Sequence, residues 1–191
     1  MMHATLAGQF RPSEAGRAVA YDAAVCLAGS ALIALSAQVA VPLWPVPITG
    51  QTLAVLLIGA LLGPLRGAAA VGLYLLEGSA GLPVFAGGGA GAGHLLGPSG
   101  GYLAGFLPAA ALTGFLAARG WDRRFGTTVA AMLLGTLTIY VPGVLWLAGF
   151  VGLPAAARGG MVVFLPGDAI KVLLAAFLLP AGWKLLNAAR P

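Results

Sequence analysis

Long runs without a charged residue are the feature that most constrains how this chain can fold. They occupy Ala23–Val41, Val46–Leu65, Leu95–Ala118 and Phe125–Ala157. A helix needs roughly 20 apolar residues to cross the hydrocarbon core of a bilayer, and each run is close to that length or longer. Charged residues make up only 8% of the chain, against about 25% in a soluble domain, whose surface must face water. The sequence therefore predicts an integral membrane protein and excludes a water-soluble globule.

We expect an all-α, polytopic fold of six transmembrane helices that forms a single domain over residues 1–191. The apolar runs are continuous and rich in Leu and Ala, whereas the strands of a transmembrane β-barrel alternate in polarity over about ten residues. Residues 1–21 lack a long apolar core, so we expect a short cytoplasmic tail and no cleavable signal. The expected spans cover residues 22–41, 47–63, 66–82, 101–118, 126–149 and 162–186.

Basic residues set the predicted orientation, because Lys and Arg near helix ends collect on the cytoplasmic side. With both termini inside, only Arg158 falls in an outer loop, and Lys171 lies within a span. The net charge of +5 is then mainly a signal of topology. The sequence has no basic stripe with interleaved aromatic residues, which is the pattern that indicates nucleic-acid binding. The residues assigned to the cytoplasm are Arg11, Arg17, Arg66, Arg119, Arg123, Arg124, Lys184 and Arg190.

Two loops on the predicted outer side are candidates for covering a cavity. Residues 41–51, VPLWPVPITGQ, contain three prolines that prevent a continuous helix, and Trp44 suits the aromatic belt of a membrane interface. Residues 82–101 are rich in glycine, which permits close approach of the backbone to a ligand or a helix. A stiff connector is the alternative for the first loop. We expect both loops to lie over an outward-facing pocket.

The sequence lacks the patterns of a nucleotide or metal site. The glycine-rich loop has no GxxxxGK[ST] pattern, and the only lysines are Lys171 and Lys184. His94 has only His3 as a second histidine, too few ligands for a metal ion. We therefore expect no cofactor and no metal. Any ATP-driven step then requires a partner subunit.

Ionisable side chains inside predicted spans indicate a functional site, because their transfer into the membrane costs free energy. Asp168 and Lys171 follow Pro166-Gly167, and their i, i+3 spacing places both on one helix face. Glu77 lies near the outer end of the third span, and Gln51 and Tyr74 add hydrogen-bonding groups. These residues predict a polar pocket in the outer half of the membrane. The local alternative is that Asp168 caps its helix and Lys171 neutralises it.

Small residues in the first span form a candidate partner interface. Ala20, Ala24 and Ala28 recur at a spacing of four, which allows a second helix to approach closely. Alanine is common in such spans, so the row by itself does not identify a partner.

Two regions of the sequence resemble the BioY family, the substrate-binding subunits of energy-coupling-factor biotin transporters. Gln38–Gly105 contains the blocks VPLWPVPITGQ, LYLLEG and, at its end, LLGPSGGYLAG, and Phe164–Ala175 is FLPGDAIKVLLA. Several blocks in the right order cover most of the chain, which makes the resemblance specific. Two positions depart from it: Gly50, where the family more often has a larger apolar residue, and His94 in the glycine loop.

The resemblance implies a six-helix fold with an outward-facing biotin pocket. Asp168 and Lys171 of the GDxxK block would contact the vitamin, and Tyr74 with Glu77 of the LYLLEG block would line the same pocket. The resemblance also implies a bacterial cytoplasmic (inner) membrane protein that works with a transmembrane coupling subunit and two ATP-binding cassette subunits. A homo-oligomer is a further possible assembly.

The chemistry of biotin matches these residue types. A carboxylate accepts the ureido N–H groups, and an ammonium meets the ureido carbonyl or the tail carboxylate. We expect the ureido ring at the Asp168–Lys171 pair, with Trp44, Phe85 and nearby aliphatic residues over the apolar part.

Three alternatives remain open from the sequence. The same architecture can bind another vitamin, because a few pocket contacts set specificity. An intramembrane enzyme can be assembled from Glu77, His94, Asp168 and Lys171, but no Ser/His/Asp arrangement, HExxH or paired aspartate motif is present. The third alternative is a passive channel or a structural membrane protein.

Overall fold

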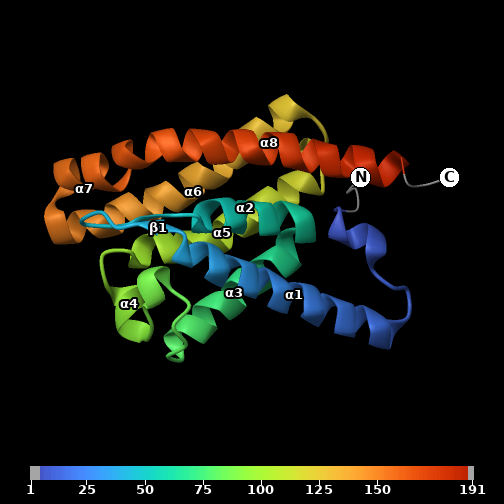
Figure 1. Cartoon of the computed structure of the whole chain (residues 1–191), viewed down its shortest axis with the longest axis horizontal. Helices are drawn as coiled ribbons and strands as arrows, with labels where there is room; N and C mark the ends of the chain where they lie inside the picture. Colours follow the sequence, from blue (N-terminus) through green and yellow to red (C-terminus); the bar gives the residue numbers. More distant parts are fainter. Residues whose placement is uncertain (1–4, 189–191) are drawn as a thin grey trace.

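Helices make up most of the structure, a computed structural model that describes residues 5–188 (Figure 1). A short hairpin joins the first two helices, in which β1 (Ala40–Val41) pairs antiparallel with β2 (Ile48–Thr49). Four 3-10 turns accompany the helices: η1 (Ala7–Phe10), η2 (Ala86–Gly88), η3 (Trp121–Arg123) and η4 (Val162–Phe164). The helices are α1 (Ala15–Gln38), α2 (Gln51–Leu62), α3 (Pro64–Ser79), α4 (Ala92–Leu96), α5 (Gly100–Ala117), α6 (Phe125–Val151), α7 (Leu153–Gly160) and α8 (Leu165–Ala188).

Four stretches within residues 5–188 are long and apolar enough to cross a membrane: α1, α5, α6 and the run Leu153–Ala188, which contains α8. The helices α2 and α3 are shorter, at 12 and 16 residues. At 1.5 Å per residue they extend about 18 Å and about 24 Å, less than the roughly 30 Å of the hydrocarbon core. The expected all-α membrane architecture is confirmed at this level.

The core of the bundle is built around α5, which packs against α2, α3 and α6. The turn between α2 and α3 needs Gly63, whose φ of 89° is unfavourable for other residues, and Pro64 starts α3. The outer faces of α1, α6 and α8 carry large exposed apolar side chains, among them Leu35, Leu145 and Phe177. Such faces suit contact with lipid, because a face turned to water would carry polar groups.

The helix α1 differs from the predicted first span at both ends. It begins at Ala15 and not at residue 22, so it includes part of the 1–21 segment expected as a cytoplasmic tail, of which residues 1–4 lie outside the described residues. The tail itself stays a prediction. The polar first turns of α1 are stabilised, because Asp22 pairs with Arg11 at 2.8 Å and with Arg66 at 3.3 Å. The helix ends at Gln38 and not at residue 41, since Ala40 and Val41 form β1.

The connecting segments gather at two opposite ends of the bundle. In Figure 1 the hairpin, α4 and α7 lie at the left end, whereas η1 and the C-terminal end of α8 lie at the right. At the right end Trp183 of α8 donates a hydrogen bond to Asp122 of η3 at 2.6 Å. Arg190, one of the residues behind the predicted orientation, lies outside the described residues. The 41–51 and 82–101 loops, which were expected to cover a pocket, contain the hairpin and α4 and so lie together at the left end in Figure 1.

Candidate functional site

A cavity, partly open to solvent, lies between the hairpin, the 82–101 loop and the helices α2, α5, α6 and α8. Both loops of the predicted outer side contribute to it. Its lining combines a few polar groups with apolar and aromatic side chains, which is typical of small-molecule sites. The lining residues are Val46, Pro47, Ile48, Thr49, Gln51, Thr52, Ala86, His94, Ser99, Tyr102, Leu103, Phe106, Tyr140, Phe164, Asp168 and Lys171.

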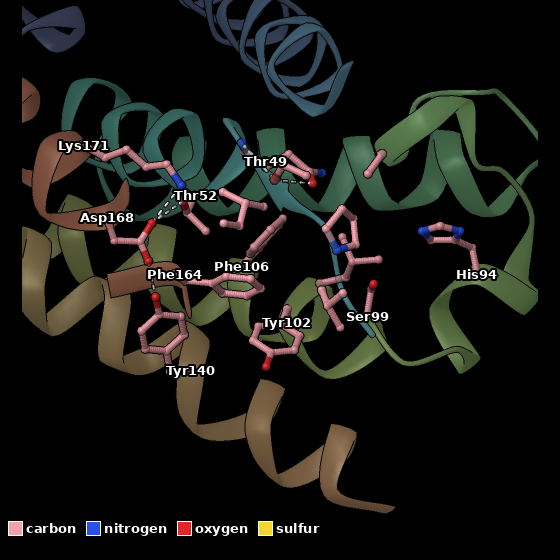
Figure 2. Close-up of a pocket in the computed structure, with 16 residues that line it drawn as sticks. Thr49, Thr52, His94, Ser99, Tyr102, Phe106, Tyr140, Phe164, Asp168 and Lys171 are labelled. Carbon is pink, nitrogen blue, oxygen red and sulfur yellow. Dashed lines mark hydrogen bonds and ion pairs between the residues drawn. The ribbon is translucent and has the colours of Figure 1, made fainter. Parts of the chain in front are cut away.

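One end of the cavity holds a cluster of polar side chains centred on Asp168, which is only 6% exposed (Figure 2). Lys171 Nζ lies 2.8 Å from Asp168 Oδ1 and 2.8 Å from Thr52 Oγ1. Tyr140 Oη donates a hydrogen bond to the other carboxylate oxygen, Asp168 Oδ2. Three helices thus supply this cluster: α2, α6 and α8. We call these four residues the charged cluster.

The start of α8 explains where the carboxylate sits. Asp168 lies in the first turn of α8, where the helix dipole favours a negative charge, and Lys171 follows one turn later on the same face. Among the described residues, the hydrogen bonds to the Asp168 carboxylate come from side chains and not from the backbone of its helix. The pair therefore does more than cap α8, because it ties α8 to α2 and α6.

A second polar group lies at the start of α2. Gln51 is buried, and its Nε2 donates a hydrogen bond of 2.5 Å to Tyr74 Oη on α3. Thr49 Oγ1 donates to Gln51 Oε1 at 3.0 Å. Gln51 lines the cavity, and Tyr74 lies behind it. The hairpin and α2 therefore hold an amide group in a fixed orientation on the cavity wall.

The other end of the cavity is formed by the glycine-rich loop. Phe85 is fully buried and stacks on His94, with ring centroids 4.9 Å apart and an angle of 18° between the planes. Its ring also meets Tyr74, edge to face, with centroids 5.5 Å apart. A Cβ at Gly78 would overlap the Phe85 ring, so α3 needs a glycine there. Phe85 thus anchors the loop in the core, and His94 rests on it at the cavity wall.

Four predicted site residues do not line this cavity: Tyr74, which lies behind Gln51, and Trp44, Glu77 and Phe85. Trp44 is 82% exposed near the tip of the hairpin, a position that suits a membrane interface. Glu77 accepts a hydrogen bond from Ser30 Oγ of α1, and Phe85 lies beneath His94. Asp168, Lys171 and Gln51 are the predicted residues that the structure brings together at the cavity. The predicted binding roles of all of them stay predictions.

The small residues predicted as a partner interface are not covered by other parts of the described chain. Ala20, Ala24 and Ala28 are all exposed on α1, the long helix with the smallest buried share. Its role as an interface stays a prediction.

Several lining residues were not predicted from the sequence. Thr52 directly follows Gln51 and faces Lys171. Tyr140 and Tyr102 lie in apolar helices, where their hydroxyl groups donate to Asp168 and to the backbone oxygen of Gly160. A tyrosine inside a predicted span is itself a signal, because its hydroxyl group needs a partner in a membrane. Phe106 and Phe164 gave no such signal, because apolar residues of a span face lipid, core or cavity equally well.

The chain is similar to a known family and to several known proteins. The model of the BioY family matches residues 8–188. The biotin transporter BioY of Rhodobacter capsulatus is 42% identical over 158 residues, which cover 75% of this chain and 82% of that protein. The probable biotin transporter BioY of Pyrococcus horikoshii is 38% identical over 148 residues, which cover 78% and 87%.

A solved structure is similar over nearly the whole fold. It is described as the S-component for biotin from an ECF-type ABC transporter, with 30% sequence identity and a TM-score of 0.77. The match covers 91% of this chain and 95% of that one.

Proposed function

The chain belongs to the BioY family, and we propose that it captures biotin at the charged cluster as the substrate-binding subunit of an energy-coupling-factor transporter. The observation that carries this proposal is the convergence of Asp168, Lys171 and Thr52 at one end of a cavity beneath two loops. Relatives named biotin transporters support the substrate. They also disfavour the intramembrane enzyme, because the family consists of transporters.

The charged cluster suits the ureido ring of biotin. This ring carries two N–H donors and one carbonyl acceptor, and no charge. Asp168 accepts from the N–H groups, while the Lys171 ammonium donates to the carbonyl. The uncharged ureido ring, which has both donors and an acceptor, gains hydrogen bonds here. Because it adds no charge, Asp168 and Lys171 continue to neutralise each other.

The middle of the cavity suits the thioether ring. Phe106 and Tyr102 of α5 lie beside Phe164 between the two ends of the cavity (Figure 2). Aromatic and aliphatic walls of this kind favour an apolar body through burial and dispersion. Val46 and Ile48 of the hairpin face the same space, so the 41–51 loop covers a bound ligand as well as the entrance.

In the membrane, we propose six spans with both termini in the cytoplasm and the cavity on the outer side of a bacterial cytoplasmic membrane. The short helices α2 and α3 then count as two spans, helped by local thinning or tilt. Arg11, Arg123 and Lys184 belong to segments at the right end in Figure 1, and Arg158 belongs to α7 at the left. Excess of basic residues at one end supports this orientation.

Energy for uptake comes from partner subunits in this proposal. The chain has no nucleotide-binding pattern, so a transmembrane coupling subunit and two ATP-binding cassette subunits would supply the ATP-driven step. The exposed row Ala20, Ala24 and Ala28 is the proposed contact with the coupling subunit. The whole of residues 1–191 acts as a single substrate-binding domain.

Equilibrium binding of biotin to the purified protein in detergent tests the proposal. We expect saturable binding that excess thiamine or riboflavin does not displace. Lys171→Met should weaken binding about tenfold or more, because a hydrogen bond to a charged group contributes about 1.5–3 kcal/mol. Lys184→Met is the matched control, since Lys184 lies exposed at the other end of the same helix.

Two outcomes would contradict the proposal. Displacement of biotin by another vitamin at equal concentration would move the substrate assignment to that vitamin. Equal weakening by both lysine variants would show that charge in general, and not the charged cluster, controls binding.

A further inference from the structure

The geometry points to His94 as the group that recognises the carboxylate tail of the ligand, at the end of the cavity opposite the charged cluster. This inference rests on the proposed function and deepens it, because it assigns the second polar end of biotin to a residue. Figure 2 shows His94 and Ser99 at one end, Asp168 and Lys171 at the other, and Tyr102 with Phe106 between them. The cavity is therefore polar at both ends and apolar in the middle, in the same order as the ligand.

The balance of charges in the lining disfavours the reversed pose, with the acid tail at Lys171. Its side chains that can carry positive charge are Lys171 and His94. Lys171 is already paired with Asp168 at 2.8 Å, so an acid tail placed there would bring a second carboxylate against Asp168. Like charges repel strongly where one of them is as buried as Asp168. His94 has no carboxylate among its cavity neighbours, which leaves it as the lining group able to neutralise an acid.

The loop holds the imidazole in position without using its hydrogen-bonding capacity. The ring lies flat on Phe85, and its Nδ1–Cε1 edge rests against Gly89, where a Cβ would come within 2.7 Å of both atoms. Stacking of this kind also stabilises a protonated ring, through the interaction of a cation with an aromatic face. Within residues 5–188 no hydrogen bond to the imidazole is present, and burial alone lowers the pKa of His94.

Proton uptake follows from this arrangement. The tail of biotin is an ordinary carboxylic acid, ionised above about pH 5 by analogy with Glu. A bound carboxylate favours the imidazolium and raises the pKa of His94 above its value in the empty cavity. Affinity is then greatest below the His94 pKa of the empty protein, and falls as the pH rises through the pKa of the complex. Each pKa unit gained on binding corresponds to about tenfold in affinity.

Other titratable groups near His94 need a control. On α3, Tyr74 lies behind Phe85, and Glu77 is bonded to Ser30 of α1. On α5, Tyr102 lines the cavity, and further away Tyr140, Asp168 and Lys171 form the other end. Biotinamide provides this control, because it keeps the ureido and thioether rings and replaces only the acid. The ratio of biotin to biotinamide affinity therefore isolates the tail.

The test measures this ratio by titration calorimetry of the whole protein in detergent between about pH 5.5 and about pH 8. We expect the ratio to be about tenfold higher at the lower pH, with proton uptake on biotin binding detected from the dependence of the heat on buffer. His94→Gln should flatten the ratio and abolish the uptake. His3→Gln is the matched control, because His3 is the second histidine of the chain, and it should keep both.

The outcomes separate this inference from the proposed function. A ratio independent of pH in the wild-type protein, or a pH dependence that persists in His94→Gln, would overturn the role of His94 while biotin capture stands. Failure of both biotin and biotinamide to bind a folded wild-type protein at any pH would instead remove the proposed function.

Discussion

Two acidic side chains predicted within spans, Asp168 on α8 and Glu77 on α3, have different surroundings. Asp168 is buried beside Lys171, Thr52 and Tyr140 and faces the cavity. Glu77 accepts one hydrogen bond from Ser30 and joins α3 to α1, away from the cavity. One carboxylate is thus buried in a polar cluster at the cavity, and the other is half-buried between two helices. What distinguishes them is a cation and polar groups from several helices converging on one carboxylate.

The largest expected effect tests this contrast directly. Asp168→Asn should weaken biotin binding about 10- to 100-fold, because hydrogen bonds to a charged group contribute about 1.5–3 kcal/mol. Glu77→Gln has the same chemical change outside the cavity and should alter affinity by no more than about twofold. Equilibrium binding in detergent compares the two variants. An equal loss of affinity in both variants would mean that a position at the cavity does not distinguish the role of Asp168 from that of Glu77.

The sequence predicted the parts of the site that depend on local spacing. Asp168 and Lys171 were expected on one helix face, and the structure places them 2.8 Å apart. Thr52 and Tyr140 reach the same carboxylate from α2 and α6, and no local pattern indicates contacts between helices so distant in sequence. The long apolar helices were predictable for a similar reason, because hydrophobic length is a property of each segment alone.

The structure of the two loops could be predicted from the sequence only in part. The prolines of residues 41–51 correctly predicted a break in helix, but the pairing of Ala40 with Thr49 depends on how the chain returns. Trp44 and Phe85 were both expected to cover the ligand. One is exposed and the other is buried beneath His94, because the placement of an aromatic residue in a glycine-rich or proline-rich loop is decided by tertiary contacts.

A smaller effect sharpens the account of Glu77. Ser30→Ala removes the partner of the carboxylate and should lower the free energy of unfolding by about 1 kcal/mol, with little change in biotin affinity. Thermal unfolding in detergent provides the measurement. Ser36→Ala is the matched control on the same helix, because Ser36 Oγ donates to Ile33 O one turn away and not to another helix among residues 5–188. A loss of affinity in Ser30→Ala without loss of stability would assign Glu77 to ligand binding after all.

The smallest effect extends the comparison to the two ends of the cavity. The charged cluster is fixed by three helices, whereas His94 is positioned by loop contacts, of which Gly89 is one. The φ of Gly89 is −59°, so alanine is allowed by the backbone, and the strain falls on the His94 ring. In Gly89→Ala, moving the His94 ring away from its preferred rotamer should cost about 0.5 kcal/mol. This cost should lower the ratio of biotin to biotinamide affinity about twofold. Gly93→Ala, with open space around its Cβ position, should leave the ratio unchanged. Equal ratios in the two variants would mean that the tail is recognised without the imidazole in its present orientation.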